Sequence, residues 1–217
     1  MSGFHSASLA DQVYEKLEND IIQGIYPRGE IITELKLVEQ LGVSRTPIRD
    51  ALRRLEQEHL IEDTGKGSVV LGISEENLID IMDIRIHIEP LASYYAAINC
   101  TPEAIQELSH IMDLQDFYFS KHDAEHLRQE DDDFHDAICQ LCQRTVIRDT
   151  LLPLHRKTRR YRKISMEDYN RQALSLEEHR AIFNAIATGD ADLAAQLTTQ
   201  HVQKAKQNMI ERLKHNG

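Results

Sequence analysis

The chain contains few of the residues that build disulfide-stapled or membrane-spanning proteins. Only three of its 217 residues are cysteine, and none is tryptophan. A small, odd number of cysteines excludes a disulfide framework and is typical of a reducing compartment, so we expect a cytoplasmic protein. No apolar run approaches about 18 residues and no secretory segment is evident, which excludes a helical membrane span. The sequence also lacks a glycine-rich loop of the kind that cradles phosphate.

The residues that are present fit a soluble globular protein. Hydrophobic residues make up 41% of the chain and charged residues 28%, and its length allows one large domain or two small ones. The net charge of −11 argues against nonspecific binding to polyanions. The charge is uneven, however, because Ser44–Arg54 contains four arginines and one aspartate, a local net charge of +3. An acidic protein can read DNA specifically through such a strip, with strong salt dependence.

Residues 40–54 have the pattern of a tight turn followed by a helix. Gly42 can adopt the positive φ that a turn requires after the preceding helical run. Ser44 or Thr46 can cap the next helix by accepting a backbone N–H group, and Pro47 suits a first helical turn, where no N–H group is needed. This arrangement predicts the turn of a helix-turn-helix.

The helix after this turn has two different faces. Its apolar side chains are Ile48, Leu52 and Leu55, and its basic side chains are Arg45, Arg49, Arg53 and Arg54. A recognition helix needs an apolar face to pack on a core and a polar face to enter a major groove. An ordinary amphipathic surface helix is the alternative, and the arginine spacing alone does not exclude it. The turn in front of the helix favours a DNA-binding helix-turn-helix.

The flanking residues predict that this motif belongs to a winged helix-turn-helix. We expect a loose tail at residues 1–8 and helices at Leu9–Gly24, Ile32–Leu41 and Thr46–His59. In Leu60–Ile73, two β-rich pieces flank Gly65-Lys66-Gly67, which predicts a two-stranded hairpin with a glycine tip. Lys66 and the N–H groups of the tip could contact phosphate or reach a minor groove, whereas the glycines could also serve only as a flexible turn. We assign residues 9–73 to a DNA-binding domain.

From Ser74 onward the sequence is helical in pattern throughout. The expected helices lie near residues 75–98, 102–121, 123–142, 145–163, 174–187 and 190–214, with breaker residues near Pro102, Pro153 and Gly189. Because no strand is evident, residues 74–217 predict an all-α antiparallel bundle of about six helices. The expected fold class is therefore mainly α, with a winged helix-turn-helix before a helical bundle.

Four residues of the predicted bundle have the chemistry of metal ligands. Asp131 and His135 are four residues apart and therefore share one helix face, while His179 and His201 fall on two later helices. One carboxylate and three imidazoles that point into a bundle suit Zn²⁺ or a similar divalent ion. With 11 histidines in the chain, such a pair also arises by chance. Asp132 lies near the same face, so the carboxylate is less firmly assigned than the histidines.

These motifs, in this order, resemble the GntR family of bacterial transcription regulators, in its FadR branch with an FCD-type ligand domain. The first signature is Gly42–Leu55, followed by a wing at Gly65–Val70. The second consists of Arg85 with Glu89, then Asp131-x-x-Phe134-His135, then Glu178-His179 leading to His201. The resemblance covers residues 9–214. His59 stands where relatives often have glycine, so the end of the recognition helix is a point of departure.

The resemblance implies roles for individual residues. DNA contacts are implied for Ser44, Arg45, Thr46, Arg49 and Gly67, and metal binding for Asp131, His135, His179 and His201. It also implies a homodimer that reads a palindromic operator, and a small organic acid that binds beside the metal and changes the affinity for DNA. The candidate partner of that acid's carboxylate is Arg85, for which a helical ion pair with Glu89 is the alternative. Zn²⁺ is the expected metal, with Ni²⁺ or another transition ion as alternatives.

We therefore predict a ligand-responsive regulator of transcription that is not an enzyme, and a repressor rather than an activator. Two alternatives stay open at this point. A bundle with one aspartate and three histidines could belong to a metal-dependent enzyme, although no separate general base stands out. In a regulator, the metal could also be purely structural.

Overall fold

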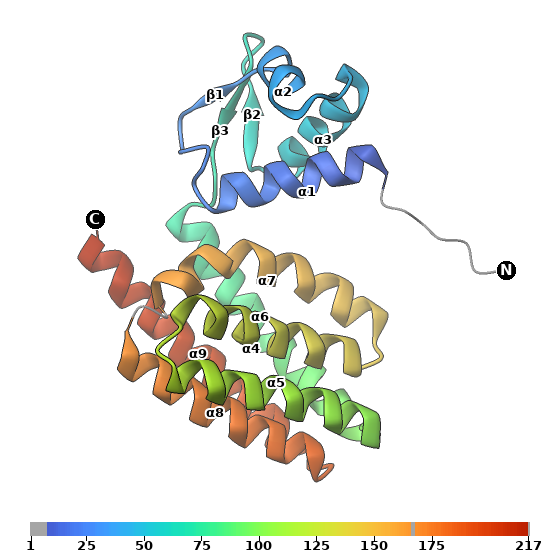
Figure 1. Ribbon diagram of the computed structural model, residues 1–217, viewed down its shortest axis with the longest axis vertical. Helices are drawn as coiled ribbons and strands as arrows, with labels where there is room; N and C mark the ends of the chain where they lie inside the picture. Colours follow the sequence, from blue (N-terminus) through green and yellow to red (C-terminus); the bar gives the residue numbers. More distant parts are fainter. Residues whose placement is uncertain (1–7, 166–167, 217) are drawn as a thin grey trace, which may run out of the picture. The chain divides into compact units, whose positions relative to one another are not determined.

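The computed structural model describes residues 8–165 and 168–216 (Figure 1). The chain divides into two compact units, one ending at Ser74 and the other beginning at Glu75. Residues 1–7 of the predicted tail lie outside the described residues. Ser8, which the sequence places in that tail, instead caps the first helix: its hydroxyl accepts from the Asp11 N–H group, and the Asp11 carboxylate accepts from the Ser8 N–H group.

The first unit is a winged helix-turn-helix. Its elements are α1 (Leu9–Ile22), β1 (Ile31–Ile32), α2 (Glu34–Leu41), α3 (Arg45–Gln57), β2 (Ile61–Asp63) and β3 (Ser68–Val70). β3 lies between β1 and β2 and is antiparallel to both, with Ile61 opposite Val70. The predicted hairpin is therefore part of a three-stranded sheet. Strand β1 was missed because it contains two residues, the second of which, Ile32, the sequence assigned to the start of the second helix.

Two residues with positive φ end the helices of the helix-turn-helix. Gly42 (φ 66°) caps α2 and donates its N–H group to the Val38 carbonyl, as the turn pattern predicts. His59 (φ 57°) follows α3 in the same left-handed region, so it adopts the conformation that glycine would adopt with less strain. Ser44 occupies the N-cap position of α3 but makes no capping hydrogen bond through its side chain, contrary to its expected role.

The apolar face of α3 anchors the unit. Ile48, Ala51 and Leu55 have no exposed surface and pack in one cluster with residues of α1, α2 and the sheet. The other buried members include Leu17, Ile21, Ile32, Leu37, Ile61 and Val70. Full burial of each larger aliphatic side chain contributes about 1.5–3 kcal/mol, so the core holds α3 firmly by one face. The opposite face of α3 stays exposed.

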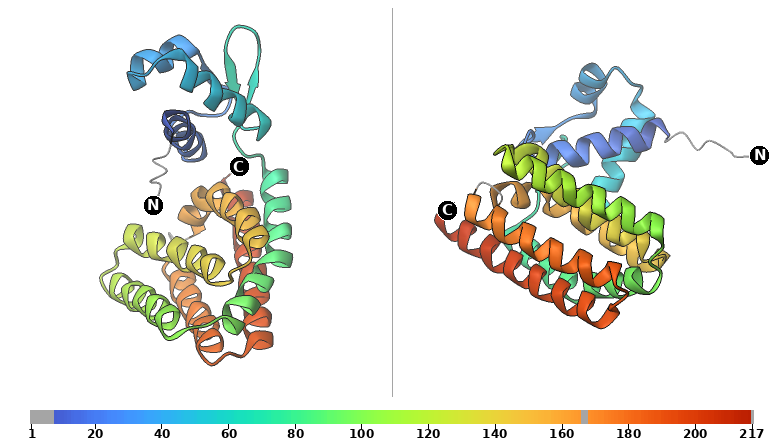
Figure 2. Two further views of the ribbon diagram at one scale, coloured as in Figure 1. Left: turned by 90° about the vertical axis from the view of Figure 1, so that its right-hand side faces the viewer. Right: turned by 60° about the horizontal axis from the view of Figure 1, so that its bottom comes forward.

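The second unit is an all-α bundle. It contains α4 (Glu75–Ile98), α5 (Pro102–Ser120), α6 (Ala124–Leu141), α7 (Thr145–Ser165), α8 (Tyr169–Ala187) and α9 (Ala191–Asn216). Helix α9 packs along α4, and two further views show these helices side by side (Figure 2). The predicted mainly α fold class, a winged helix-turn-helix followed by a helical bundle, is confirmed. Within residues 8–165 and 168–216, no helix is both long and apolar enough to cross a bilayer.

One helix start in the bundle differs from the sequence prediction, and one helix contains an internal proline. Helix α8 begins at Tyr169 rather than near residue 174, because the Asp168 side chain accepts the Asn170 N–H group and caps an additional turn. Helix α7 continues through Pro153, which the sequence marked as a breaker. A proline inside a helix removes one hydrogen bond, and the packing of α7 against α4 and α6 outweighs that loss.

The wing contains a glycine whose replacement tests its packing. Gly67 has φ 142°, and a Cβ atom there would lie 2.9 Å from the Ile32 carbonyl oxygen and 2.9 Å from Ile31 Cγ2. Gly65 (φ 74°) is also in the left-handed region, but a Cβ atom on it would meet nothing within 4 Å. We expect Gly67→Ala to destabilise the wing by about 1–3 kcal/mol, since it adds a backbone clash to the strain.

The measurement is hydrogen exchange of the β3 amides in the full-length protein, with Gly65→Ala as the matched control. The control should lower protection by about 1 kcal/mol or less, because only backbone strain acts there. Equal protection of β3 in the two variants would show that the close approach of Gly67 to β1 does not limit the wing.

Candidate functional site

A basic groove of about 570 Å³ lies between α3 and the wing of the first unit. Its cationic lining residues are Arg45, Arg49, Arg53 and Lys66, and its acidic ones are Glu34, Glu56 and Asp63. The wing glycines Gly65 and Gly67 also line it. Guanidinium groups on an exposed helix face can donate paired hydrogen bonds to guanine or to phosphate. This groove therefore has the chemistry of a nucleic-acid interface.

Four of the six residues predicted to contact DNA line this groove. These are Arg45, Arg49, Lys66 and Gly67. Ser44 and Thr46 are exposed at the start of α3 but are not among the lining residues. The Ser44 hydroxyl is not used in capping and can therefore accept or donate a hydrogen bond elsewhere. Arg53 also lines the groove, although the sequence analysis did not propose it as a contact.

The arginines of α3 are held in different ways. Arg49 Nε lies 2.8 Å from Glu34 Oε1, and this hydrogen bond raises the pKa of Arg49. Both side chains are exposed, so the pair contributes little to stability. Arg54, by contrast, stacks 3.8 Å from the centre of the Tyr14 ring and binds Asp11 on α1. Arg49 is thus available at the groove, whereas Arg54 ties α3 to α1.

In the bundle, three buried histidines from three helices meet. His135 on α6, His179 on α8 and His201 on α9 each offer a ring nitrogen, and these nitrogens all lie within 4.8 Å of one another. The Nε2 atoms of His135 and His201 are 3.3 Å apart. The predicted histidine trio is therefore brought together in space, although its members are 44 and 22 residues apart along the chain.

Each of the three imidazoles is held from behind by an oxygen atom. The Nδ1 atom of His135 lies 3.5 Å from Glu89 Oε2, that of His179 lies 3.0 Å from Gln115 Oε1, and that of His201 lies 2.7 Å from Glu178 Oε2. Each oxygen accepts a proton carried on Nδ1, which leaves the Nε2 lone pair facing the centre of the trio. Such backing oxygens orient the histidine ligands of metal sites.

The orientation of Gln115 is itself fixed. Its Nε2 atom donates to the Glu130 carbonyl oxygen at 2.9 Å, so its amide oxygen must be the group that faces His179. Gln115 was not singled out from the sequence, and its separation of 64 residues from His179 provides no spacing signal. Glu89 and Glu178 were noted only as parts of motifs, not as partners of histidines.

The trio fits a divalent metal ion. His179 Nε2 is buried and has no hydrogen-bond partner among the described residues, which is a costly state for a polar atom. The lone pairs of His135 and His201 also face one another, an arrangement that a cation between them would stabilise. Burial lowers the pKa of His135 to about 4 and the pKa of His179 well below its usual value. Neutral imidazoles are the form that binds metal.

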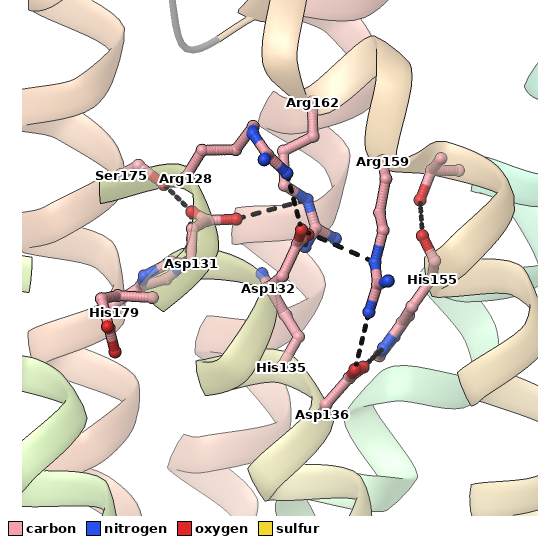
Figure 3. A network of polar contacts seen from close by, with 12 residues as sticks. Arg128, Asp131, Asp132, His135, Asp136, His155, Arg159, Arg162, Ser175 and His179 are labelled. Carbon is pink, nitrogen blue, oxygen red and sulfur yellow. Dashed lines mark hydrogen bonds and ion pairs between the residues drawn. The ribbon is translucent and has the colours of Figure 1, made fainter. Parts of the chain in front are cut away.

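Asp131, the fourth predicted ligand, lies beside the trio rather than within it. Its Oδ1 atom is 3.6 Å from His179 Nε2 and accepts from the Ser175 hydroxyl at 3.3 Å. Its Oδ2 atom lies 3.2 Å from Arg162 Nε (Figure 3). Burial opposes the ionisation of Asp131, but Arg162 and the histidines outweigh burial and lower its pKa. An ionised carboxylate next to His179 has the charge and position of a possible ligand.

Asp131 belongs to a larger network of ion pairs between α6 and α7. Asp132 contacts Arg162 and lies 3.1 Å from Arg128 Nη1 and 3.6 Å from Arg159 Nε. Arg159 and His155 also bind Asp136, at 3.4 Å and 2.8 Å (Figure 3). His155 in turn contacts Glu89 at 3.1 Å, so the network reaches the carboxylate behind His135.

A cavity of about 50 Å³ adjoins the histidines. Its lining includes His135, His201, Asp131, Arg85, Arg162 and Arg171. Arg85, the predicted partner of an acidic ligand, is buried; it pairs with Glu89 and donates to the Thr158 hydroxyl at 3.0 Å. Arg85 thus both lines the cavity and makes the helical ion pair that was its alternative. Its role toward a ligand stays a prediction.

Two family models match the chain, one for each unit. The model described as bacterial regulatory proteins of the gntR family matches residues 9–70, and the FCD domain model matches residues 80–204. The FCD match includes Arg85, Asp131 and the three histidines. Together, the two matches cover both structural units and place the groove and the trio in different domains.

Individual relatives agree with these matches. The gluconate operon transcriptional repressor of Bacillus licheniformis is 30% identical over 195 residues, which span 86% of this chain and 79% of that protein. The transcriptional repressor RspR of Escherichia coli K12 is 26% identical and is matched over 91% of this chain and 87% of its own length. The solved structure of E. coli McbR/YncC has the same fold, with a TM-score of 0.79, 22% identity, and coverage of 98% of this chain and 100% of that one.

These families and relatives are transcription regulators, not enzymes. The helix-turn-helix and its wing lie within the gntR match, and the helical domain holds the FCD match. The chain therefore belongs to the GntR family of bacterial regulatory proteins, as a DNA-binding transcription regulator with an FCD domain.

Proposed function

We propose that this regulator binds a palindromic operator as a homodimer and represses transcription, with its DNA affinity controlled by a small organic acid bound near a metal in the FCD domain. The proposal includes membership of the FadR branch of the family and a cytoplasmic location, where the chromosome is accessible. The buried Nε2 atom of His179 carries the metal part of the proposal, because it has no hydrogen-bond partner among the described residues and a bound metal would compensate for that loss. Relatives that are named as repressors support repression rather than activation.

The metal would be held by His135, His179 and His201, with Asp131 as a fourth ligand. Three imidazoles and a carboxylate favour Zn²⁺, although Ni²⁺ and other transition ions accept the same donors. When bound, the ion supplies a positive charge and an open coordination position for a ligand oxygen. Glu89, Gln115 and Glu178 hold the imidazoles in the orientation that this role needs.

An anionic effector suits the adjoining cavity. Three guanidinium groups line it against a single carboxylate, while Glu89, Asp132 and Glu178, which pair with those arginines, are not lining residues. A relative named for the gluconate operon supports an organic acid as the class of effector. Ligand binding here would act on α4 through Arg85 and Glu89. Only Leu71–Ser74 separate α4 from strand β3 of the wing, so α4 is the covalent route to the DNA-binding unit.

A palindromic operator has two half-sites, and a second copy of the chain would supply the recognition helix for the second one. Ile84, Leu91 and Ile98 are spaced seven residues apart along α4, so they share one face, and 43%, 47% and 55% of their surfaces are exposed. An apolar stripe of this kind is typical of helix pairing. We propose that α4 pairs with α4 of the other protomer, which would connect the spacing of two recognition helices to the effector site.

Metal content tests the histidine trio. Protein purified without a histidine tag and dialysed against Zn²⁺ should contain close to one ion per chain by elemental analysis, and His179→Ala should lose it because one of three inward lone pairs is removed. His110→Ala replaces an exposed histidine of α5 and serves as the matched control, with unchanged zinc. Wild-type protein without zinc, or a His179→Ala variant that retains it, would contradict the proposed site.

DNA binding tests the groove. We expect Arg49→Ala to weaken binding to a duplex selected by the wild-type protein from a random library by about 1–3 kcal/mol and to relax base preference. Arg54→Ala is the control on the same helix, because Arg54 contacts Tyr14 and Asp11 instead of the groove. Fluorescence anisotropy would measure both variants. An Arg49→Ala affinity equal to that of wild type would remove this arginine from the interface.

Light scattering tests the dimer. Leu91→Glu places a charge in the exposed stripe of α4 and should shift the mass from two chains to one, since an unpaired charge in an apolar interface is unfavourable. Leu193→Glu on α9, where 40% of the residue is exposed, is the control that should stay dimeric. A wild-type protein of single-chain mass, or a Leu91→Glu variant that remains a dimer, would argue against pairing through α4.

A further inference from the structure

Arg162 differs from the other two arginines of the cavity beside the histidines. The guanidinium group of Arg85 is engaged through Nε with Glu89 and through Nη1 with Thr158. Both terminal nitrogens of Arg171 donate to Glu178 Oε2, at 3.1 and 3.2 Å. Arg162 uses Nε for Asp131 and Nη1 for Asp132, while its Nη2 atom is buried and has no partner among the described residues.

A partnerless guanidinium nitrogen in this position points to a missing acceptor. The Arg162 side chain is only 10% exposed, so bulk water does not compensate for the absent hydrogen bond. The Nε atoms of Arg128 and Arg159 are also buried and have no hydrogen-bond partner among the described residues, but neither residue lines the cavity. Within the described part of the chain, Arg162 is thus the lining arginine that combines a positive charge with an unused buried donor.

The surroundings of Arg162 suit a carboxylate. The Asp131 and Asp132 carboxylates hold the guanidinium group through two of its nitrogens, Nε and Nη1, which restricts its orientation before any ligand arrives. A preorganised guanidinium group forms charge-assisted hydrogen bonds at little entropic cost. Thr158 and Ser175 also line the cavity, but their hydroxyls already donate to the His155 carbonyl oxygen and to Asp131, so Arg162 supplies the unused donor.

We propose that Arg162, rather than Arg85, holds the carboxylate of the effector in this cavity. The inference rests on the proposed effector function and assigns a specificity-determining residue to it. Arg85 then has a different role, which is to neutralise Glu89 and keep that carboxylate in place behind His135. Because Arg162 also binds Asp131, the same guanidinium group connects the ligand to the carboxylate beside the histidine trio.

The test is calorimetric titration of the zinc-loaded, full-length protein with acetate, lactate and gluconate, using the acid that binds most tightly to wild type. We expect Arg162→Gln to weaken binding of that acid about tenfold to a hundredfold, the range for loss of a charge-assisted hydrogen bond. Arg162→Lys should fall in between, because it keeps the charge but loses the planar donor pair. Zinc content of each variant is measured in parallel.

Arg159→Gln is the matched control. It also removes a guanidinium group that contacts Asp132, but Arg159 does not line the cavity. Because truncating a group that does not touch the ligand changes affinity little, the affinity for the acid should stay within about twofold of wild type. Equal weakening by Arg159→Gln and Arg162→Gln would overturn the inference in favour of a purely structural ion network. Wild-type affinity in Arg162→Gln would overturn it as well. If none of the three acids binds wild type at millimolar concentration, the proposed effector function fails and the inference falls with it.

Discussion

The bundle depends on the pairing of charges that it buries. Glu89, Asp131 and Asp132 are each less than 5% exposed, and an unpaired carboxylate at that depth would be strongly destabilising. Arginines from α4, α6 and α7 neutralise them, and the resulting contacts join three helices around the histidines. Removal of one partner from such a pair leaves a buried charge, so the network fixes the relative positions of α6 and α7 more strictly than apolar packing alone would. Of the three histidines, His135 lies on α6 and is therefore positioned directly by that constraint.

The two units use opposite strategies with similar residues. In the bundle, Arg85, Arg162 and Arg171 are largely buried and paired with carboxylates, which makes them part of the framework. On α3, the apolar face supplies the framework, and the arginines at the groove stay exposed. Arg54 is the exception, since it stacks on Tyr14 and thereby connects α3 to α1. Arginine side chains therefore pack on an aromatic ring, neutralise a buried carboxylate or line the groove, according to the groups that surround them.

Sequence reasoning predicted the features that have local signals. The turn at Gly42, the two-faced helix α3 and the helical pattern after Ser74 all depend on neighbours within a few residues, and the helix periodicity placed His135, His179 and His201 on separate helices. Strand β1 is too short for any pattern. The earlier start of α8 depends on one capping contact from Asp168. Gln115 and Arg162 could not be singled out, because their roles arise from contacts across 64 and 31 residues of chain, for which spacing is uninformative.

The acids in the groove of the winged unit bear on how the protein searches a genome. Four cationic side chains line the groove, and three carboxylates line it with them. Nonspecific retention on DNA depends on the number of phosphates that a protein neutralises, and here part of that capacity is used internally, as in the Glu34–Arg49 pair. Because the whole protein also carries a net charge of −11, we expect its complexes with nonspecific DNA sites to be short-lived. If Arg49 contacts bases as proposed, long residence requires those contacts to replace Glu34 as its partner, and the pair with Glu34 would then shorten the search.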